Sequence, residues 1–365
     1  MENYFSCRIK LIGGSLMRNK VPAKSLIVGI VALCICASIV SGYTTSSPHS
    51  MSRGILYVGG SGPGNYTSIQ EAIDNSTSGD TIFVYNGTYN ENVDTKLKKV
   101  SLIGEDRDIT IINGQTTNPV VRIGNSDTSI SGFTLMGNSD ETILLVSTLS
   151  ENVFITNNII KNGMYGIDLA VTTSRVTISD NTIMDHVYIG IQMKTSTYNV
   201  IQRNFIQNNG AQGIDVSLSS HHNSILNNSI TGNGEEGIAI NGLASTENTI
   251  QGNDVSENKL GIRFLSGAGT NEVIGNNIEG SSMEGLMLQS SSENTIEQNN
   301  FIDNHRQATF KLSNRNVWDA NYWSNWIGLK FSAPIFQKFP KVIFGGVRMN
   351  FDKNPALVPY NISVL

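Results

Sequence analysis

Gly213-Ile214-Asp215-Val216 is one copy of a four-residue pattern, Gly-Ile-x-aliphatic, that recurs through the middle of this 365-residue chain. The glycines of successive copies lie 24, 23, 24, 24 and 24 residues apart. The six copies are Gly166-Ile167-Asp168-Leu169, Gly190-Ile191-Gln192-Met193, Gly213-Ile214-Asp215-Val216, Gly237-Ile238-Ala239-Ile240, Gly261-Ile262-Arg263-Phe264 and Gly285-Leu286-Met287-Leu288. A fixed period of this length, built from short apolar pairs, is typical of a solenoid that winds one coil per repeat.

A second signature, Asn-x-aliphatic-x-x-Asn-x-aliphatic, runs between the glycines. Its asparagines are Asn199/Asn204, Asn223/Asn228, Asn248/Asn253, Asn271/Asn276 and Asn294/Asn299. The repeat lacks the i, i+3, i+4 apolar spacing of helical repeats, whereas its alternation suits short strands with every second side chain inward. Asn tolerates the bends between strands, and its amide can bond to the same residue one coil away. The pattern predicts an all-β fold, a right-handed single-stranded parallel β-helix of about 24 residues per coil with pectate-lyase-like architecture.

Residues 1–50 have the composition of an export segment. Arg18, Lys20 and Lys24 precede an apolar run over 26–40, which small and polar residues follow. This order predicts a cleaved signal peptide or an uncleaved N-terminal membrane anchor, followed by a polar linker. Both alternatives place the protein outside the cell or at its surface, with membrane contact only through this segment.

The chain after residue 50 is acidic. It retains 20 basic and 29 acidic residues, a formal charge of 20 − 29 = −9, compared with −5 for the whole chain. Such a body disfavours nucleic acid as a partner, because nucleic-acid binding needs a basic surface. All three cysteines precede residue 50, so the remainder forms no disulfide and depends on its stacked core.

The folded part divides into three segments. Residues 51–80 form a predicted N-terminal cap with a short helix over 68–74, in which Ser68 and Glu71 make a capping-box pattern. Residues 81–312 form the predicted β-helix, and residues 313–365 a C-terminal cap. A solenoid needs such caps because its end coils otherwise expose strand edges and core side chains.

Several motifs resemble a known family. The stretch Ser68-Ile69-Gln70-Glu71-Ala72-Ile73, the strand over 79–84 and the Gly-Ile-x-aliphatic coils are similar to the NosD-like branch of the carbohydrate-binding and sugar-hydrolase β-helix domains, common in exported archaeal proteins. The resemblance implies the β-helix fold over most of the chain and says little about activity, since the matching positions are turns and core residues. NosD proteins are associated with copper-site maturation, but this chain has no Met/His/Cys cluster to support that role.

The x position of the repeat is the candidate functional row. If Ile214 and Val216 face inward, an outer row is formed by Asp168, Gln192, Asp215, Ala239, Arg263 and Met287. A lyase or epimerase on acidic glycans would use Asp168, Asp215 and Arg263 as catalytic residues, with calcium as the cofactor of a lyase. Gln192 and Lys194 are the candidate ligand-binding residues on this face. Because Ala239 and Met287 interrupt the row, we expect an ordinary solvated face.

The sequence predicts no metal site and no resident cofactor. His186, His221, His222 and His305 lack the spacing of zinc ligands. The aspartate pair and Gly-His-Gly motif of polygalacturonase-type glycosidases are also missing, so no carboxylate pair for glycoside hydrolysis can be named.

The repeat ends after Asn304, and aromatic residues follow. All three tryptophans, Trp318, Trp323 and Trp326, lie here. Trp323 and Trp326 are candidates for stacking on sugar rings, and the alternative is an aromatic plug that seals the last coil.

Five Asn-x-Ser/Thr triplets are candidate glycosylation sites, and the alternative is that an Asn- and Ser/Thr-rich chain contains them by chance. Their asparagines are Asn65, Asn75, Asn86, Asn227 and Asn361.

Two classes of function follow from these features. The first is a noncatalytic exported protein whose long polar face contacts polysaccharide or cell-envelope components. The second is a carbohydrate-active enzyme, a lyase or epimerase. They differ in whether Asp168, Asp215 and Arg263 share a groove or lie on an open sheet.

Overall fold

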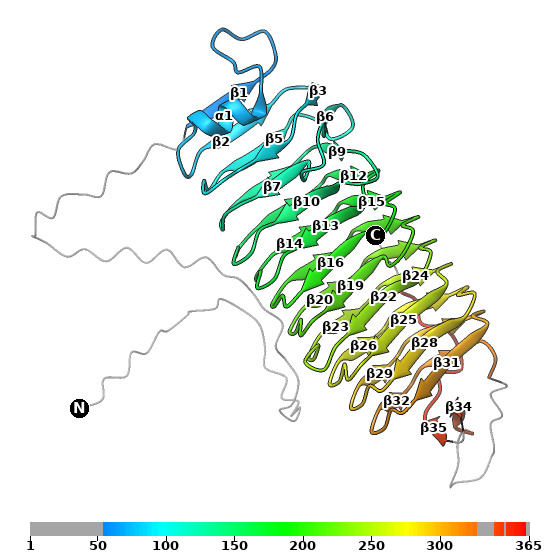
Figure 1. The fold of residues 1–365 in the computed structure, drawn as a ribbon. Coiled ribbons are helices and arrows are strands. Elements are labelled where there is room, and N and C mark those ends of the chain that lie inside the picture. The colour runs from blue at the N-terminus through cyan, green and yellow to red at the C-terminus, as the bar shows by residue number, and fades with distance from the viewer. Residues whose placement is uncertain (1–53, 327–338, 347, 363–365) are drawn as a thin grey trace, which may run out of the picture. The chain divides into compact units, whose positions relative to one another are not determined.

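The computed structural model describes residues 54–326, 339–346 and 348–362. In this part of the chain, three parallel sheets of 12, 11 and 10 strands run side by side along a right-handed β-helix (Figure 1). Each coil contributes one strand to each sheet, so the predicted three-sided coil and the predicted fold class are confirmed. The predicted export segment, residues 1–50, lies outside the described residues.

We name the sheets A, B and C. Sheet A contains β1 (Ile55–Val58), β2 (Thr81–Val84), β5 (Ser101–Gly104), β8 (Ser129–Ser131), β11 (Phe154–Thr156), β14 (Thr177–Ser179), β17 (Val200–Gln202), β20 (Ser224–Leu226), β23 (Thr249–Gln251), β26 (Glu272–Ile274), β29 (Thr295–Glu297) and β32 (Val317–Asp319). Sheet B contains β3 (Gly87–Asn90), β6 (Thr110–Asn113), β9 (Thr134–Met136), β12 (Ile159–Lys161), β15 (Thr182–Met184), β18 (Phe205–Gln207), β21 (Ser229–Thr231), β24 (Asp254–Ser256), β27 (Asn277–Glu279), β30 (Asn300–Ile302) and β33 (Tyr322–Trp323). Sheet C contains β4 (Val93–Asp94), β7 (Val121–Ile123), β10 (Thr142–Val146), β13 (Tyr165–Leu169), β16 (Ile191–Lys194), β19 (Ile214–Ser217), β22 (Glu236–Asn241), β25 (Leu260–Leu265), β28 (Glu284–Gln289) and β31 (Arg306–Lys311).

The Gly-Ile-x-aliphatic repeat forms the strands of sheet C, and its aliphatic residues fill the core. Ile214 pairs with Ile191 on one side and Ile238 on the other, and all three side chains are fully buried. The x residue between the two aliphatic residues points outward on each strand. The predicted inward and outward assignment is therefore confirmed.

Asparagines stack in ladders at the corners of the coil. Asn204 illustrates the bonding: its backbone N–H and its Nδ2 donate to Asn228 Oδ1 at 2.9 and 3.0 Å, and Nδ2 also donates to the Ile178 carbonyl at 2.8 Å. Each amide thus satisfies backbone groups that a bend would leave unpaired inside the protein. The two ladders predicted from the sequence are present.

A third ladder, not predicted, runs through Asn209, Asn233 and Asn258. It begins at His186, whose backbone N–H donates to Asn209 Oδ1 at 3.2 Å. The His186 ring replaces the amide of an asparagine: Nδ1 accepts from the Gly163 N–H at 3.2 Å, and Nε2 lies 3.1 Å from the Ile160 carbonyl oxygen. Burial lowers the pKa of His186 from 6.5 to about 4.

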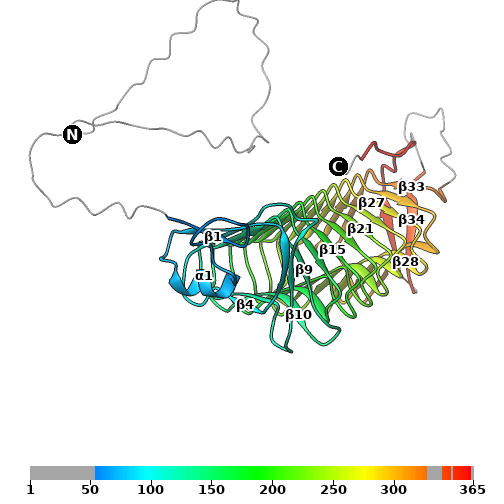
Figure 2. The ribbon, with the colours of Figure 1, turned by 90° about the horizontal axis from the view of Figure 1, so that it is seen from above.

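The N-terminal end of the core is covered by α1 (Ile69–Asn75), seen at one end of the coils in Figure 2. Ser68 caps the helix as predicted, and its Oγ accepts from the Glu71 N–H. The carboxylate that binds the helix N-terminus is Glu91, which accepts from the Ile69 and Gln70 N–H groups at 2.9 Å each. An anion at this position is stabilised by the helix dipole and the free N–H groups.

The C-terminal end is sealed by an aromatic layer and a hairpin. Trp323 is only 1% exposed, its ring stacks on Phe301 at 4.3 Å, and its Nε1 donates to Asp352 Oδ2 at 3.0 Å. Trp326 is half-buried and packs against the same core. The prediction that Trp323 stacks on sugars is therefore wrong, because its ring is buried against the last coil. The alternative prediction, an aromatic plug that seals this coil, is confirmed for Trp323.

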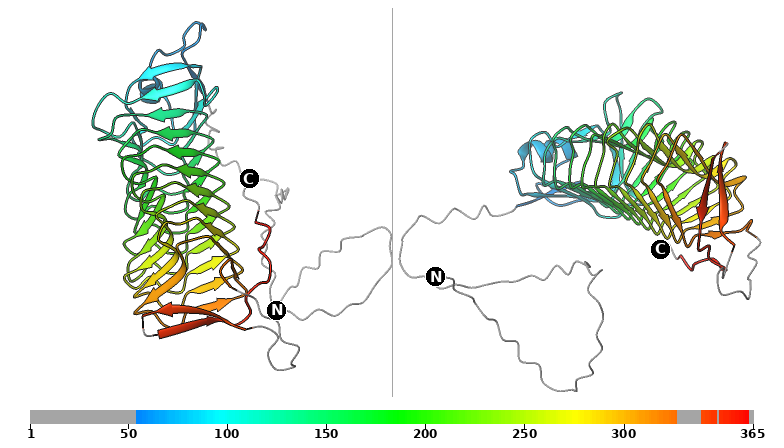
Figure 3. Two further views of the ribbon diagram at one scale, coloured as in Figure 1. Left: turned by 90° about the vertical axis from the view of Figure 1, so that its right-hand side faces the viewer. Right: turned by 90° about the horizontal axis from the view of Figure 1, so that it is seen from below.

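The hairpin consists of β34 (Lys341–Gly345) and β35 (Arg348–Asp352), antiparallel to each other, and crosses the end of the coils (Figure 3). Its buried Asp352 terminates an asparagine ladder, because Oδ2 accepts from the Asn321 N–H and Nδ2 at 2.9 and 3.1 Å. The parallel sheets themselves run beyond the predicted range 81–312, from β1 to β33. Among the described residues, no helix has the length and apolar character needed to cross a membrane.

Candidate functional site

The predicted outer row exists along sheet C. Strand pairing places Asp168 next to Gln192, Gln192 next to Asp215, and then Ala239, Arg263 and Met287 one coil further each. The strands that present this row follow one another from β13 to β28 in Figure 1. Asp168 and Asp215 are two coils apart, as are Asp215 and Arg263, which corresponds to about 10 Å in each case.

The row is not the ordinary solvated face that we expected. The Asp168 side chain is only 18% exposed. Burial raises the pKa of Asp168 and that of Asp215 above their usual range. Residues of adjacent coils contribute to these environments: Lys194 lies beside Asp168, and Gln192 and Glu236 lie next to Asp215. A single-strand pattern does not reveal such contacts between coils.

Asp168, Lys194 and Tyr165 form a group at the N-terminal end of the row. Lys194 Nζ lies 3.5 Å from Asp168 Oδ1 and 6.0 Å from the centre of the Tyr165 ring. Tyr165 in turn meets Tyr188 edge to face at 5.7 Å. The sequence prediction included Asp168 and Lys194 but missed Tyr165, although its position directly before a repeat glycine marks it as a sheet C residue.

Asp215 occupies the middle of the row. Burial raises its pKa, the charge of Glu236 raises it further, and side-chain hydrogen bonds from Ser217 and Gln192 act in the opposite direction. The structure thus places Gln192 and Asp215 next to each other on neighbouring strands, as the predicted outer row requires.

Arg263 is held by carboxylate and amide groups from adjacent coils. Its Nη1 donates to Glu236 Oε1 at 2.8 Å and its Nη2 to Gln289 Oε1 at 3.3 Å. Gln212 donates to the second oxygen of Glu236 at 2.8 Å. Glu236 and the equivalent Glu284, both 4% exposed, were missed in the sequence prediction. The available signal was that each directly precedes a repeat glycine, where a buried charge is unusual.

A shallow pocket of about 390 Å³ lies at the C-terminal end of the row. Among its lining residues, Arg306 lies 2.5 Å from Glu284 Oε1, while Leu260 and Met287 add apolar surface. Arg263 therefore does share a concavity, but with Glu236, Glu284 and Arg306. We call the outward residues of this face the polar strip: Tyr165, Asp168, Gln192, Lys194, Asp215, Glu236, Arg263, Glu284 and Arg306.

Four buried polar atoms of the polar strip have no hydrogen-bond partner within the described chain. They are Asp168 Oδ1, whose one charged contact among the described residues is the 3.5 Å ion pair with Lys194 Nζ, Gln192 Oε1, Arg263 Nε and Glu284 Oε2. A buried polar group without a partner costs about 1–3 kcal/mol. These atoms consequently favour a ligand or ordered water that supplies the missing bonds.

The donors in the described residues do not fit a calcium or copper site. No group of three or more His, Cys, Asp or Glu side chains converges there. Both ring nitrogens of His186 contact backbone groups, and His222 Nδ1 lies 3.0 Å from Glu247 while its ring stacks on Tyr198.

The candidate glycosylation sites remain predictions. Asn75, Asn86, Asn227 and Asn361 are exposed, whereas Asn65 is half-buried and its Nδ2 donates to the Gly59 carbonyl at 2.6 Å.

Together, the three-sided coil, the asparagine ladders and the outward polar strip define a right-handed parallel β-helix protein. A sequence model of the NosD family, described as "Periplasmic copper-binding protein (NosD)", matches residues 73–243 and 219–328, more than half of the chain. The chain belongs to the NosD family.

One similar protein is the probable ABC transporter binding protein NosD of Pseudomonas aeruginosa (strain PAO1). It is 26% identical over 160 residues, which is 42% of this chain and 28% of that protein. The matching region is thus less than a third of the relative's length, and the activity of the whole relative does not transfer with it.

Solved structures share the fold at low sequence identity. The A-module of the mannuronan C-5 epimerase AlgE6 of Azotobacter vinelandii has a TM-score of 0.60 at 17% identity, covering 70% of this chain and 81% of that chain. The Dettilon tailspike protein has a TM-score of 0.58 at 17% identity, with coverages of 70% and 58%. XylC in complex with xylose has a TM-score of 0.56 at 10% identity, with coverages of 71% and 72%.

Proposed function

We propose that this protein is an exported, noncatalytic polysaccharide-binding protein, and that the polar strip of sheet C is its binding surface. The observation that carries the proposal is the set of four buried polar atoms without hydrogen-bond partners, all on sheet C, one pair on β13 and β16 and the other on β25 and β28. A ligand that supplies donors and acceptors at regular intervals along the β-helix would satisfy them together.

The chemistry of the strip suits a glycan. Sugar hydroxyls donate and accept, so one chain can serve Asp168 Oδ1 and Arg263 Nε alike. Tyr165 and Met287 offer aromatic and apolar surface to the C–H faces of sugar rings. The epimerase module with the same fold acts on mannuronan, which supports a carbohydrate ligand for this chain.

The binding role rests on how the carboxylates are engaged. Asp168 lies beside Lys194, Asp215 lies next to Gln192 on the neighbouring coil, and Glu236 binds Arg263. Side chains held in this way fix an orientation for hydrogen bonding. Export, which we also propose, is supported by the composition of residues 1–50 and by the periplasmic location in the description of the family.

Affinity electrophoresis of the full chain in gels that contain mannuronan, pectate or a neutral glucan tests the proposal. Replacing Gln192 and Lys194 by Ala should weaken binding about tenfold or more, because each loses a polar contact to the ligand. Gln207→Ala, in the same coil but on sheet B, is the matched control and should bind as the wild type. Equal retardation of the three proteins in every gel would refute the assignment.

A second function, a lyase or epimerase on acidic glycans, is favoured by the raised pKa values of Asp168 and Asp215. A carboxyl with a raised pKa holds its proton more readily, so it can face a uronate carboxylate or donate a proton. Incubation with polyuronates, with and without calcium, should then give unsaturated or epimerised products that disappear in Asp215→Ala. No product with any polyuronate would dismiss catalysis and leave binding intact.

A further inference from the structure

The hairpin that closes the C-terminal end has an apolar outer face. Ile343 and Asp352 point into the protein and are buried, whereas Phe344, Met349 and Phe351 are 62%, 56% and 44% exposed. Phe344 pairs with Met349 across the hairpin, and Phe351 pairs with Val342, so these four side chains share one face. The hairpin lies across the end of the β-helix in both views of Figure 3.

This arrangement departs from what an end cap requires. A terminal cap needs an apolar inner face to cover the core and a polar outer face for solubility. Here Ile343 and Asp352 already fulfil the inner role, and the exposed aromatic and aliphatic residues add nothing to the seal. An exposed apolar face with no structural task marks an interaction surface.

Charge is distributed unequally along the sequence, and the described residues from 306 onward carry six basic and two acidic side chains. Residues 51–305 contain 12 basic and 27 acidic residues, 12 − 27 = −15, whereas residues 306–365 contain 8 basic and 2 acidic residues, 8 − 2 = +6. Both counts together give the −9 of residues 51–365. On the hairpin, Arg348 and the following Lys353 are exposed, and the one acidic residue, Asp352, is buried.

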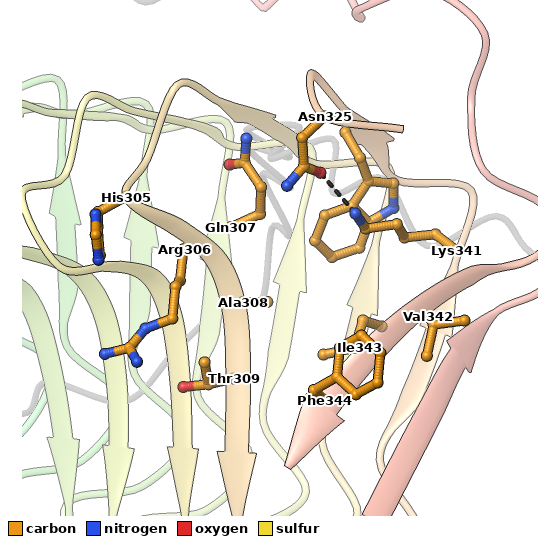
Figure 4. Close-up of a pocket in the computed structure, with 11 residues that line it drawn as sticks. His305, Arg306, Gln307, Ala308, Thr309, Asn325, Lys341, Val342, Ile343 and Phe344 are labelled. Atoms are coloured by element: carbon orange, nitrogen blue, oxygen red, sulfur yellow. Dashed lines mark hydrogen bonds between the residues drawn. The ribbon is translucent and has the colours of Figure 1, made fainter. Parts of the chain in front are cut away.

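A pocket of about 250 Å³ lies between β31 and β34 beside this face (Figure 4). Its lining includes the cationic side chains Arg306 and Lys341 and, on its outer side, Phe344. Lys341 Nζ donates to Asn325 Oδ1 at 2.6 Å and lies 5.8 Å from the centre of the Trp323 ring. Its contacts among the described residues are thus neutral, which leaves its charge available to an anion.

We propose that this end of the protein docks onto an anionic lipid membrane. Phe344, Met349 and Phe351 enter the interface between headgroups and acyl chains, while the exposed Arg348 and Lys353 contact the lipid phosphates. Aromatic and aliphatic residues flanked by basic ones are the side chains that bind anionic bilayer surfaces. The strongly acidic body is repelled by the same surface, so the β-helix stands on its C-terminal end and leaves the polar strip open to solvent.

Vesicle sedimentation of the full chain tests this docking. Phosphatidylcholine vesicles are compared with phosphatidylcholine–phosphatidylglycerol vesicles at low and high salt. The N-terminal segment is present in every sample, so the readout is the difference between variants. Replacing Phe344, Met349 and Phe351 by Ser should weaken binding to the anionic vesicles about tenfold or more, and so should the double variant Arg348→Glu, Lys353→Glu.

A matched control removes the same number of exposed apolar residues from the body: Leu149, Leu218 and Leu243 replaced by Ser. This control should bind anionic vesicles like the wild type. Thermal melts establish that each variant is folded, and the charge-reversed variant changes only exposed positions if the triple variant fails to fold. Hydrogen exchange over residues 341–352 should slow on addition of anionic vesicles.

Two results would overturn the inference. One is equal binding of the wild type and both hairpin variants to anionic vesicles. The other is self-association of the wild type without vesicles that the hairpin variants abolish, which would assign the face to a second copy of this chain. The docking does not depend on polysaccharide binding, so either proposal can fail alone.

Discussion

At the scale of single residues, neighbouring positions of one strand face opposite sides of the sheet, one toward the core and the other outward. Ile214 lies in the core, fully buried, and Asp215 lies on the polar strip with a pKa raised by burial. The raised pKa means that ionising Asp215 disfavours the folded state. Its contribution to stability is full below the unfolded pKa and is lost as the pH rises through the folded pKa.

The pair yields a direct comparison. Ile214→Asp should lower the free energy of unfolding by about 4 kcal/mol or more, because it places an unpaired carboxylate in the core. Asp215→Ala should change it by less than about 1 kcal/mol at neutral pH. Thermal melts followed by circular dichroism measure both, and equal destabilisation would contradict the facing of β19.

The buried His186 side chain should make the stability of the protein sensitive to acid. Because burial lowers its pKa from 6.5 to about 4, the unfolded chain binds a proton that the folded chain does not. Stability should fall as the pH drops through this window, by up to about 3 kcal/mol. His186→Asn, which places the ladder residue at this position, should remove that part of the pH dependence. Denaturant titrations of both proteins between neutral pH and pH 4 give the difference, and parallel curves would disprove the role of His186.

At the scale of the element, the last asparagine of a ladder needs a hydrogen-bond acceptor, because no further coil supplies one. Asp352 Oδ2 provides it by accepting from the Asn321 N–H, Asn321 Nδ2 and Trp323 Nε1. A hairpin residue far along the chain thus completes the hydrogen bonding of the last coil, which couples the stability of β33 to that of β35.

Asp352→Ala should therefore destabilise the C-terminal coil. Three buried donors lose their acceptor, at a cost on the order of 3 kcal/mol in total. Asp352→Asn keeps one carbonyl acceptor and should cost less. The measurements are the melting temperature and hydrogen exchange in β32 and β33. An alanine variant that melts and exchanges like the wild type would show that Asp352 does not stabilise the last coil.

Sequence reasoning succeeded where one period governs a residue's environment. The Gly-Ile-x-aliphatic repeat predicted the coil, the facing of Ile214 and the two ladders that start from paired asparagines. It failed where contacts between coils decide the environment, as for the buried Asp168 and the Tyr165 beside it. The ladder role of His186 was missed because a histidine stands where the repeat has asparagine. The C-terminal hairpin was also missed, although Gly345-Gly346 between two strand-like runs is a turn signal.

At the scale of the whole β-helix, binding should depend on the length of the ligand. The strip extends from β13 to β31, six strand spacings apart in sheet C, which is about 29 Å. A short oligosaccharide reaches only part of the four unpartnered atoms, whereas a longer one reaches them together. Multiple weak contacts on one chain add up in affinity until the strip is covered.

Isothermal titration calorimetry with a size-fractionated oligosaccharide series, made from whichever of mannuronan, pectate or neutral glucan the protein retains, tests this claim most directly. We expect the affinity to rise with each added sugar until the ligand spans β13 to β31, and then to level off. Full affinity for a disaccharide, or no binding by any member of the three series, would contradict the assignment of the polar strip.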